Sequence, residues 1–202
     1  MKAEISHMVN QKKFESIKKD HGGYASWAIW ADEGERPKDN VGDLSIFDIG
    51  NYASFIQHLK PNIILVGLNI SSRPIEGALG NFHDARPQSQ DFKIRYALKD
   101  TPFWGAYMTD IIKDFQQKSS GKMMSYLRND KVFEEENVKT FRGEINDLGV
   151  NNPTIVAFGG DAHKVLNRNF KGEYAIHKIP HYSMYISKEK YREEVKSTWE
   201  NL

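Results

Sequence analysis

Four apolar stretches of the sequence lead into polar residues of the types that carry chemistry. Asn69 ends the run NIILVGLN, Asp110 lies in AYMTDII, Asp161 ends AFGGD, and His181 follows the proline after EYAIHKI. An amide can hold a water molecule but cannot take its proton, and an ionised aspartate only accepts hydrogen bonds. An imidazole can stabilise negative charge that develops during a reaction. These residue types suit hydrolytic chemistry if the fold brings them together.

The apolar pattern predicts elements that would position these side chains. The segments 62–68, 106–112, 153–160 and 173–179 predict four strands, of which 62–68 and 153–160 are expected to be buried. Periodic apolar residues predict helices at 52–59 and 131–148. Further helices are predicted at QDFKIRYAL, at AHKVLNR with Asp161 as its N-cap, and at the charged tail SKEKYREEVKSTWENL.

This alternation predicts an α/β three-layer sandwich with a central, mostly parallel four-stranded sheet. Ligands of such sheets bind beyond the carboxyl ends of the strands, which is where the four polar residues stand. The length of 202 residues fits a single domain, 1–202. Residues 1–45 form an N-terminal extension of uncertain role, in which GGYASWAIWADEG could make a strand or hairpin.

Composition limits the class of protein. The 28 basic and 27 acidic residues nearly balance, so charge neither demands nor excludes nucleic acid as a partner. The absence of cysteine excludes disulfides, thiolate zinc sites and iron–sulfur clusters. No stretch has the apolar length of a signal peptide core or a membrane span. We therefore expect a cytoplasmic protein, active as a monomer and without a membrane partner.

The ordered set GLN, a downstream Phe, YMTDIIK, PTIVAFGGDAH and IPHYSMY resembles the uracil-DNA glycosylase superfamily over about residues 60–186. In that family the first motif reads G-x-D-P or G-x-N-P, and Asn69 stands at its water-handling position. The family's base-stacking aromatic follows thirteen residues later, at Phe82. Asp110 stands where the family has an Asn that reads the base edge. His181 begins the motif that resembles H-P-S-P-L.

The resemblance implies a DNA repair enzyme of base excision, which hydrolyses the N-glycosidic bond of a damaged or modified base flipped out of DNA. It implies no metal and no cofactor, with Asn69 and His181 as the catalytic residues. The implied substrate-binding residues are Gly67, Leu68, Ile70, Ser71, Phe82 and Asp110. The implied DNA-binding residues are Ser72, Gly160, Asp161, Ser183 and Tyr185, of which Tyr185 aligns with the wedge that fills the gap left by the base. Lys113 would add local positive charge.

The sequence departs from the family pattern in ways that change the expected substrate. Ile70 replaces the proline of the first motif, Asp110 replaces the reading Asn, and both prolines of the last motif are missing. An ionised Asp110 would repel O4 of uracil and favour an exocyclic amino group or a protonated ring nitrogen. Burial could instead raise the pKa of Asp110 and keep it a hydrogen-bond donor. The small Ser71 leaves room for a substituent at C5. We therefore expect a modified or deaminated purine or a 5-substituted pyrimidine rather than plain uracil.

Two alternative functions stay open at this point. The protein could be a catalytically silent relative that binds nucleic acid or a nucleobase, or an unrelated small-molecule hydrolase on a flavodoxin-like sheet. Each site residue also has a structural explanation, such as core packing for Phe82 or a turn for Asn69. Histidines and aspartates in NFHD and GGDAH offer a metal site without a recognised spacing. The glycosylase hypothesis requires Asn69, Phe82, Asp110 and His181 to meet at one pocket.

Overall fold

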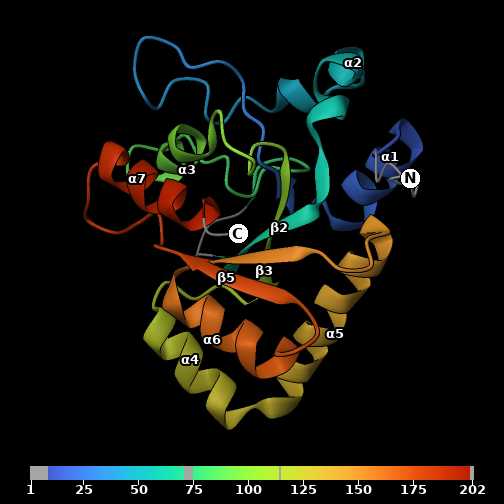
Figure 1. The fold of residues 1–202 in the computed structure, drawn as a ribbon, viewed down its shortest axis with the longest axis vertical. Helices are drawn as coiled ribbons and strands as arrows, with labels where there is room; N and C mark the ends of the chain where they lie inside the picture. Colours follow the sequence, from blue (N-terminus) through green and yellow to red (C-terminus); the bar gives the residue numbers. More distant parts are fainter. Residues whose placement is uncertain (1–8, 71–74, 114, 201–202) are drawn as a thin grey trace.

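A mixed five-stranded sheet in the order β1-β3-β2-β4-β5 forms the centre of the protein (Figure 1). The structure is a computed structural model that describes residues 9–70, 75–113 and 115–200. Its strands are β1 Ser26–Trp27, β2 Lys60–Asn69, β3 Ala106–Ile112, β4 Thr154–Phe158 and β5 Ala175–Ile179. Strands β2 to β5 pair in parallel, whereas β1 pairs with β3 in the antiparallel direction. The predicted α/β class and the mostly parallel sheet are confirmed.

The prediction of four strands was wrong, because β1 is a fifth. It lies in the stretch GGYASWAIWADEG and spans only two residues, too few for a periodic pattern to appear in the sequence. Ser26 pairs with Met108 and Trp27 with Tyr107, and the rings of Trp27 and Tyr107 meet edge to face at 5.2 Å. The N-terminal segment therefore contributes a strand to the sheet.

Helices cover both faces of the sheet (Figure 1). They are α1 Gln11–His21, α2 Tyr52–Phe55, α3 Asp91–Leu98, α4 Ser120–Asn129, α5 Lys131–Leu148, α6 Gly159–Phe170 and α7 Lys188–Trp199. On β2, Ile64 and Val66 pack on the face covered by α1, α5 and α6, whereas Leu65 packs on the face covered by α3 and α7. This alternation is why the strand reads as continuously apolar in the sequence.

Most of the predicted helices are present, with differences at their ends. The helix α5 has the predicted bounds, with an N-cap at Asp130 and a left-handed Gly149 at its C-terminus. The helix at 52–59 divides into α2 and a 3-10 turn at Ile56–His58. The prediction of Asp161 as an N-cap was wrong, because α6 begins at Gly159, and Asp161 lies inside its first turn. The positive φ of Gly159 lets β4 pass directly into α6.

A buried ion pair fixes the carboxyl end of β3 to α5. Lys113 Nζ lies 2.6 Å from Glu144 Oε1, and the two side chains are 4% and 0% exposed. Tyr107 donates its hydroxyl to Glu144 Oε2 at 2.8 Å, and burial together with the Glu144 charge raises the pKa of Tyr107 well above its usual value. Lys113 also donates to Thr109 Oγ1 at 2.9 Å. The expectation that Lys113 offers positive charge to DNA is wrong, since its ammonium is enclosed by these partners.

Replacing Lys113 with methionine is expected to destabilise the fold strongly. The variant leaves the Glu144 carboxylate buried without a cation, which typically costs about 3–5 kcal/mol. Urea denaturation measures the free energy of unfolding. The control is Lys190→Met, which removes a cation from an exposed pair with Glu193 and should leave that free energy unchanged. Equal losses in both variants would contradict a special role for the buried pair.

Candidate functional site

The carboxyl ends of the four parallel strands open onto a cavity of about 1070 Å³. Segments 67–70, 158–162 and 178–184 line it, together with Asp110 of β3. The loop before α3 and one face of α7, with Glu194, Ser197 and Thr198, complete the wall. Pockets of about 300–1,000 Å³ accommodate drug-sized ligands, so the space exceeds what a single nucleobase needs.

Most of the predicted site residues meet at this cavity. Those that line it are Gly67, Leu68, Asn69, Ile70, Asp110, Gly160, Asp161, His181 and Ser183. Phe82 and Tyr185 are not among the lining residues. Ser71 and Ser72 lie outside the described residues, so their predicted roles have no structural account.

The carboxylate of Asp110 lies against the backbone of β2. Gly67 and Asp110 are register partners, and a Cβ built on Gly67 would lie 2.1 Å from Asp110 Oδ1. The other oxygen, Oδ2, accepts a hydrogen bond from Asn81 Nδ2 at 2.9 Å. The same amide donates to the carbonyl of Tyr24 at 2.8 Å, so Asn81 ties Asp110 to a second segment of the chain. The carboxyl group of Asp110 is therefore held in a fixed position in the cavity wall.

Backbone carbonyls orient the side chain of Asn69. Its Nδ2 donates to the carbonyls of Ile70, Phe115 and Gln117 at 2.9, 3.2 and 2.9 Å. The reversed amide would place its oxygen against three carbonyl oxygens, so this assignment is fixed by the network. No donor among the described residues reaches Asn69 Oδ1.

The hydrogen bonds of His181 define its tautomer. The backbone N–H of Ser183 donates to Nδ1 at 3.2 Å, and the Ser183 hydroxyl lies 2.8 Å from the same nitrogen. Because Nδ1 accepts, the proton of the neutral ring is on Nε2. Burial lowers the pKa of His181, and the Asp91 carboxylate partly opposes this shift. The ring, stacked on Tyr182 at 4.4 Å, is thus a neutral N–H donor near pH 7.

Phe82 lies behind the cavity wall. Asn69, Asp110 and His181 therefore line the cavity, but Phe82, the fourth residue that the glycosylase hypothesis requires there, does not. Its side chain is 2% exposed, and its ring packs against Phe158 at 5.7 Å and Tyr182 at 6.3 Å between centroids. Its backbone has a positive φ of 64°, and Asn81 Oδ1 accepts its N–H. The aromatic rings that line the cavity are those of Phe158 and Tyr182.

Sequence reasoning missed the lining residues Asn81, Asp91, Phe158 and Tyr182. Position offered a signal for two of them, since Phe158 immediately precedes GGD and Tyr182 immediately follows His181. Asn81 immediately precedes Phe82, and Asp91 is the second residue of the predicted helix QDFKIRYAL, but neither position indicates a cavity in the sequence.

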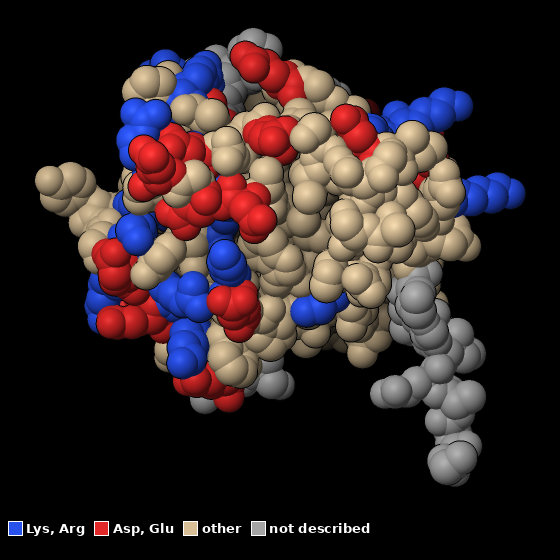
Figure 2. Space-filling model, turned by 90° about the horizontal axis from the view of Figure 1, so that it is seen from above, with Lys and Arg blue, Asp and Glu red and all other residues tan. Residues whose placement is uncertain are grey.

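The charges around the cavity are mixed in sign. Asp84, Asp91, Asp110, Asp161 and Glu194 line it along with Arg86, Lys118 and Lys178. Two of the acids have cations beside them, with Arg86 Nε 3.0 Å from Asp84 and Lys164 Nζ 3.1 Å from Asp161. On the face seen in Figure 2, basic and acidic side chains are interspersed without a continuous basic stripe. Within the described ranges, no three His, Asp or Glu side chains are grouped so that they could hold a metal ion.

Adding a methyl group at Gly67 is expected to displace Asp110. The new Cβ would overlap a carboxylate that Asn81 holds in place, and such overpacking typically costs about 1–3 kcal/mol. The matched control is Gly143→Ala in α5, where an added Cβ meets nothing within 4 Å. That variant should gain up to about 1 kcal/mol of helix stability. Chemical denaturation of both variants checks the prediction, and a Gly67→Ala protein as stable as wild type would refute it.

The stability of the protein is expected to depend on pH through His181. Its pKa in the folded state lies below the usual 6.5, so the unfolded state binds more protons just below pH 6.5. The free energy of unfolding should therefore rise as pH increases toward 6.5 and then level off. His181→Gln should lack this contribution. An NMR titration of the imidazole with a midpoint at or above 6.5 would show that the ring is not held neutral.

Comparison with protein families and with curated proteins identifies no relative. No protein-family model matches the chain, and no curated protein matches it. Among the described residues, no helix has the length and apolar character needed to cross a membrane. The chemical interpretation therefore rests on the geometry of the cavity.

Proposed function

We propose that the protein hydrolyses the N-glycosidic bond of a modified base flipped out of DNA. One observation carries this proposal: Asn69, Asp110 and a His181 with its proton on Nε2 line the same cavity. The motifs that contain these residues are the ones that resemble the uracil-DNA glycosylase superfamily. The proposal includes a monomeric, cytoplasmic enzyme.

The proposed chemistry matches the two polar groups to the charges of the transition state. Breaking the bond gives a cationic sugar and an anionic leaving base. The Nε2–H of His181 would donate to an oxygen of the base, where negative charge appears only as the bond breaks. Asn69 Oδ1 would accept a hydrogen bond from the attacking water. Because the sugar is already cationic, the water does not need a base to take its proton before it attacks. It needs only to be positioned, and it can release its proton after the attack. These steps require no metal or redox cofactor.

The proposed substrate is a base with a donor on its reading edge. The Asp110 carboxylate accepts hydrogen bonds, and Asn81 holds it in place, so it favours an exocyclic amino group over the O4 of uracil. Phe158 and Tyr182 line the cavity and could stack on the base, which is worth about 1–3 kcal/mol. This stacking would offset part of the cost of extruding the base. Gly160, Asp161, Ser183 and Tyr185 are the proposed DNA contacts.

A second candidate is a catalytically silent protein that binds a nucleobase or nucleic acid. It is favoured by the amide of Asn69, which cannot take a proton from water, and by the burial of Phe82 behind the wall. Binding through Asp110 and the two lining aromatic rings would be unaffected by either feature.

An oligonucleotide panel tests the proposal, with abasic-site formation as the readout. Wild-type protein is expected to cleave one or more modified bases with an amino group, and His181→Ala should slow this by about 100-fold. Asp110→Asn should shift the preference toward uracil, since an amide can also donate to O4. The control is His58→Ala, which lies just before β2, at the opposite end of that strand from Asn69.

The outcomes separate the two candidates. Robust cleavage of uracil alone would refute the proposed specificity. Binding of several modified oligonucleotides without any abasic product would favour the silent protein. Unchanged activity in His181→Ala would remove the proposed role of the imidazole.

A further inference from the structure

The turn between β5 and α7 presents an aromatic side chain to solvent beside the cavity. Tyr185 is fully exposed, and its neighbour Met184 is also exposed. Ser183 and Met184 line the cavity, so Tyr185 stands at its edge. Large aromatic side chains are mostly buried in folded proteins, and a solvent-facing ring next to a cavity is a common feature of binding surfaces.

A buried lysine on α3 holds this turn. Lys93 is 6% exposed, and its ammonium donates to the carbonyls of Met184 at 3.0 Å and Ile186 at 2.8 Å. These two carbonyls belong to the residues on either side of Tyr185. Within the turn, the N–H of Met184 donates to the carbonyl of His181, and that of Ile186 donates to the carbonyl of Met184. The backbone on both sides of the ring is therefore fixed.

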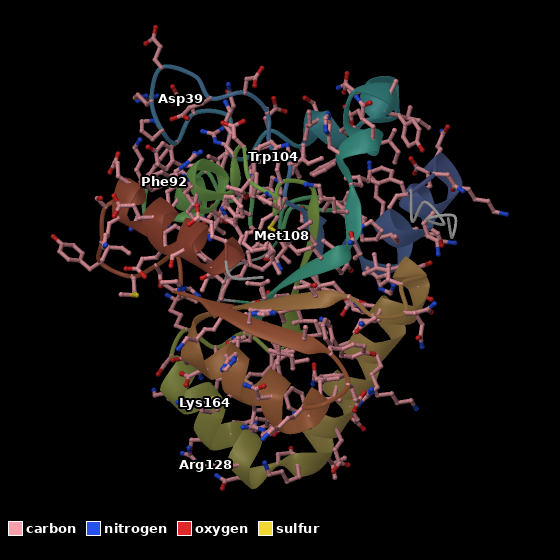
Figure 3. All side chains as sticks on the ribbon, in the orientation of Figure 1. Asp39, Phe92, Trp104, Met108, Arg128 and Lys164 are labelled. Atoms are coloured by element: carbon pink, nitrogen blue, oxygen red, sulfur yellow. The ribbon has the colours of Figure 1, made fainter. Side chains whose placement is uncertain are left out.

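The surroundings of Lys93 make this arrangement costly. Burial and the nearby charge of Lys38 both lower the pKa of its ammonium. Lys38 itself lies over the ring of Phe92, the neighbour of Lys93, at 5.2 Å. Figure 3 shows Phe92 on the side of the molecule where α3 and α7 pack together. Carbonyl groups on an exposed turn can form hydrogen bonds with water and do not need a buried cation as their partner. The role of the Lys93 ammonium is therefore to hold the turn in place.

We propose that Lys93 is a positioning residue that holds the 184–186 turn so that the Tyr185 ring enters the DNA base stack next to the flipped base. This inference rests on the proposed function. A turn whose backbone is already ordered loses less conformational freedom on binding, so holding this turn should increase affinity. Apolar wedges of this kind act on stacked duplex DNA and have no gap to fill in a single strand.

The test measures binding to two probes of known composition. One is a DNA duplex that contains a tetrahydrofuran abasic analogue next to 2-aminopurine, and the other is the same strand without its complement. Fluorescence of 2-aminopurine reports both binding and unstacking. Lys93→Met and Tyr185→Ala should each weaken duplex binding by about tenfold or more, with little effect on the single strand. Lys93→Arg, which keeps a cation with several donors, should restore part of the loss.

The matched control is Lys60→Met. Lys60 also donates to a backbone carbonyl, that of Pro102 at 2.8 Å, and burial also lowers the pKa of its ammonium. It begins β2, at the opposite end of that strand from Asn69, so DNA binding should be unchanged. The double variant Lys93→Met with Tyr185→Ala should bind the duplex no worse than Tyr185→Ala alone, because both changes remove the same interaction.

Several results would overturn the inference. These are a wild-type protein without duplex binding, a Lys93→Met protein with wild-type affinity, and an equal loss on duplex and single strand. Failure of the proposed activity is distinguishable from all three. In that case the oligonucleotide panel would give no abasic product, while the fluorescence of the duplex still responds to Tyr185 and Lys93.

Discussion

The contact between the Asp110 carboxylate and the backbone of Gly67 sets the geometry of the whole cavity. It is possible only because Gly67 has no side chain and because β2 and β3 pair in the register that places the two residues side by side. Asn81 bonds the same carboxylate and accepts the N–H of Phe82. The Phe82 ring then supports Phe158 and Tyr182 from behind. The close approach of β2 and β3 is therefore linked, through Asn81 and Phe82, to the positions of the two aromatic rings in the opposite wall of the cavity.

Three polar side chains that line the cavity, those of Asn69, Asp110 and His181, are oriented by hydrogen bonds with neighbouring residues. Carbonyls orient the amide of Asn69, the Ser183 N–H orients His181, and Asn81 orients Asp110. Below them, the buried Lys113–Glu144 pair fixes the end of β3 to α5. Groups that are oriented in advance would need little reorganisation as charge develops in the proposed reaction.

The fold was predictable from the sequence wherever the apolar signal was long. The strands β2, β3 and β4 and the helix α5 each have several buried positions, which the local sequence displays directly, whereas in β5 only Ile179 is buried. The strand β1 has two residues, and its existence depends on pairing with β3, far along the chain. Its place in the sheet could not be read from local pattern.

The same distinction explains the candidate site. Asn69, Asp110 and His181 could be predicted because each stands at or near the end of a strand with a clear signal. The burial of Lys113 could not, because a lysine is normally exposed and its partner Glu144 comes from a different element. The placement of the Phe82 side chain depends on the positive φ of Phe82 itself. A positive φ is uncommon at residues other than glycine, and no sequence pattern predicts it here.

The packing of α7 against α3 has a consequence for how the protein is made. Residues of α7 complete the cavity wall, but their partners on α3 lie about midway along the chain. Contacts between such distant segments form late, because a long loop must close first. A nascent chain on the ribosome would therefore carry an assembled sheet with an unfinished site until this helix has emerged.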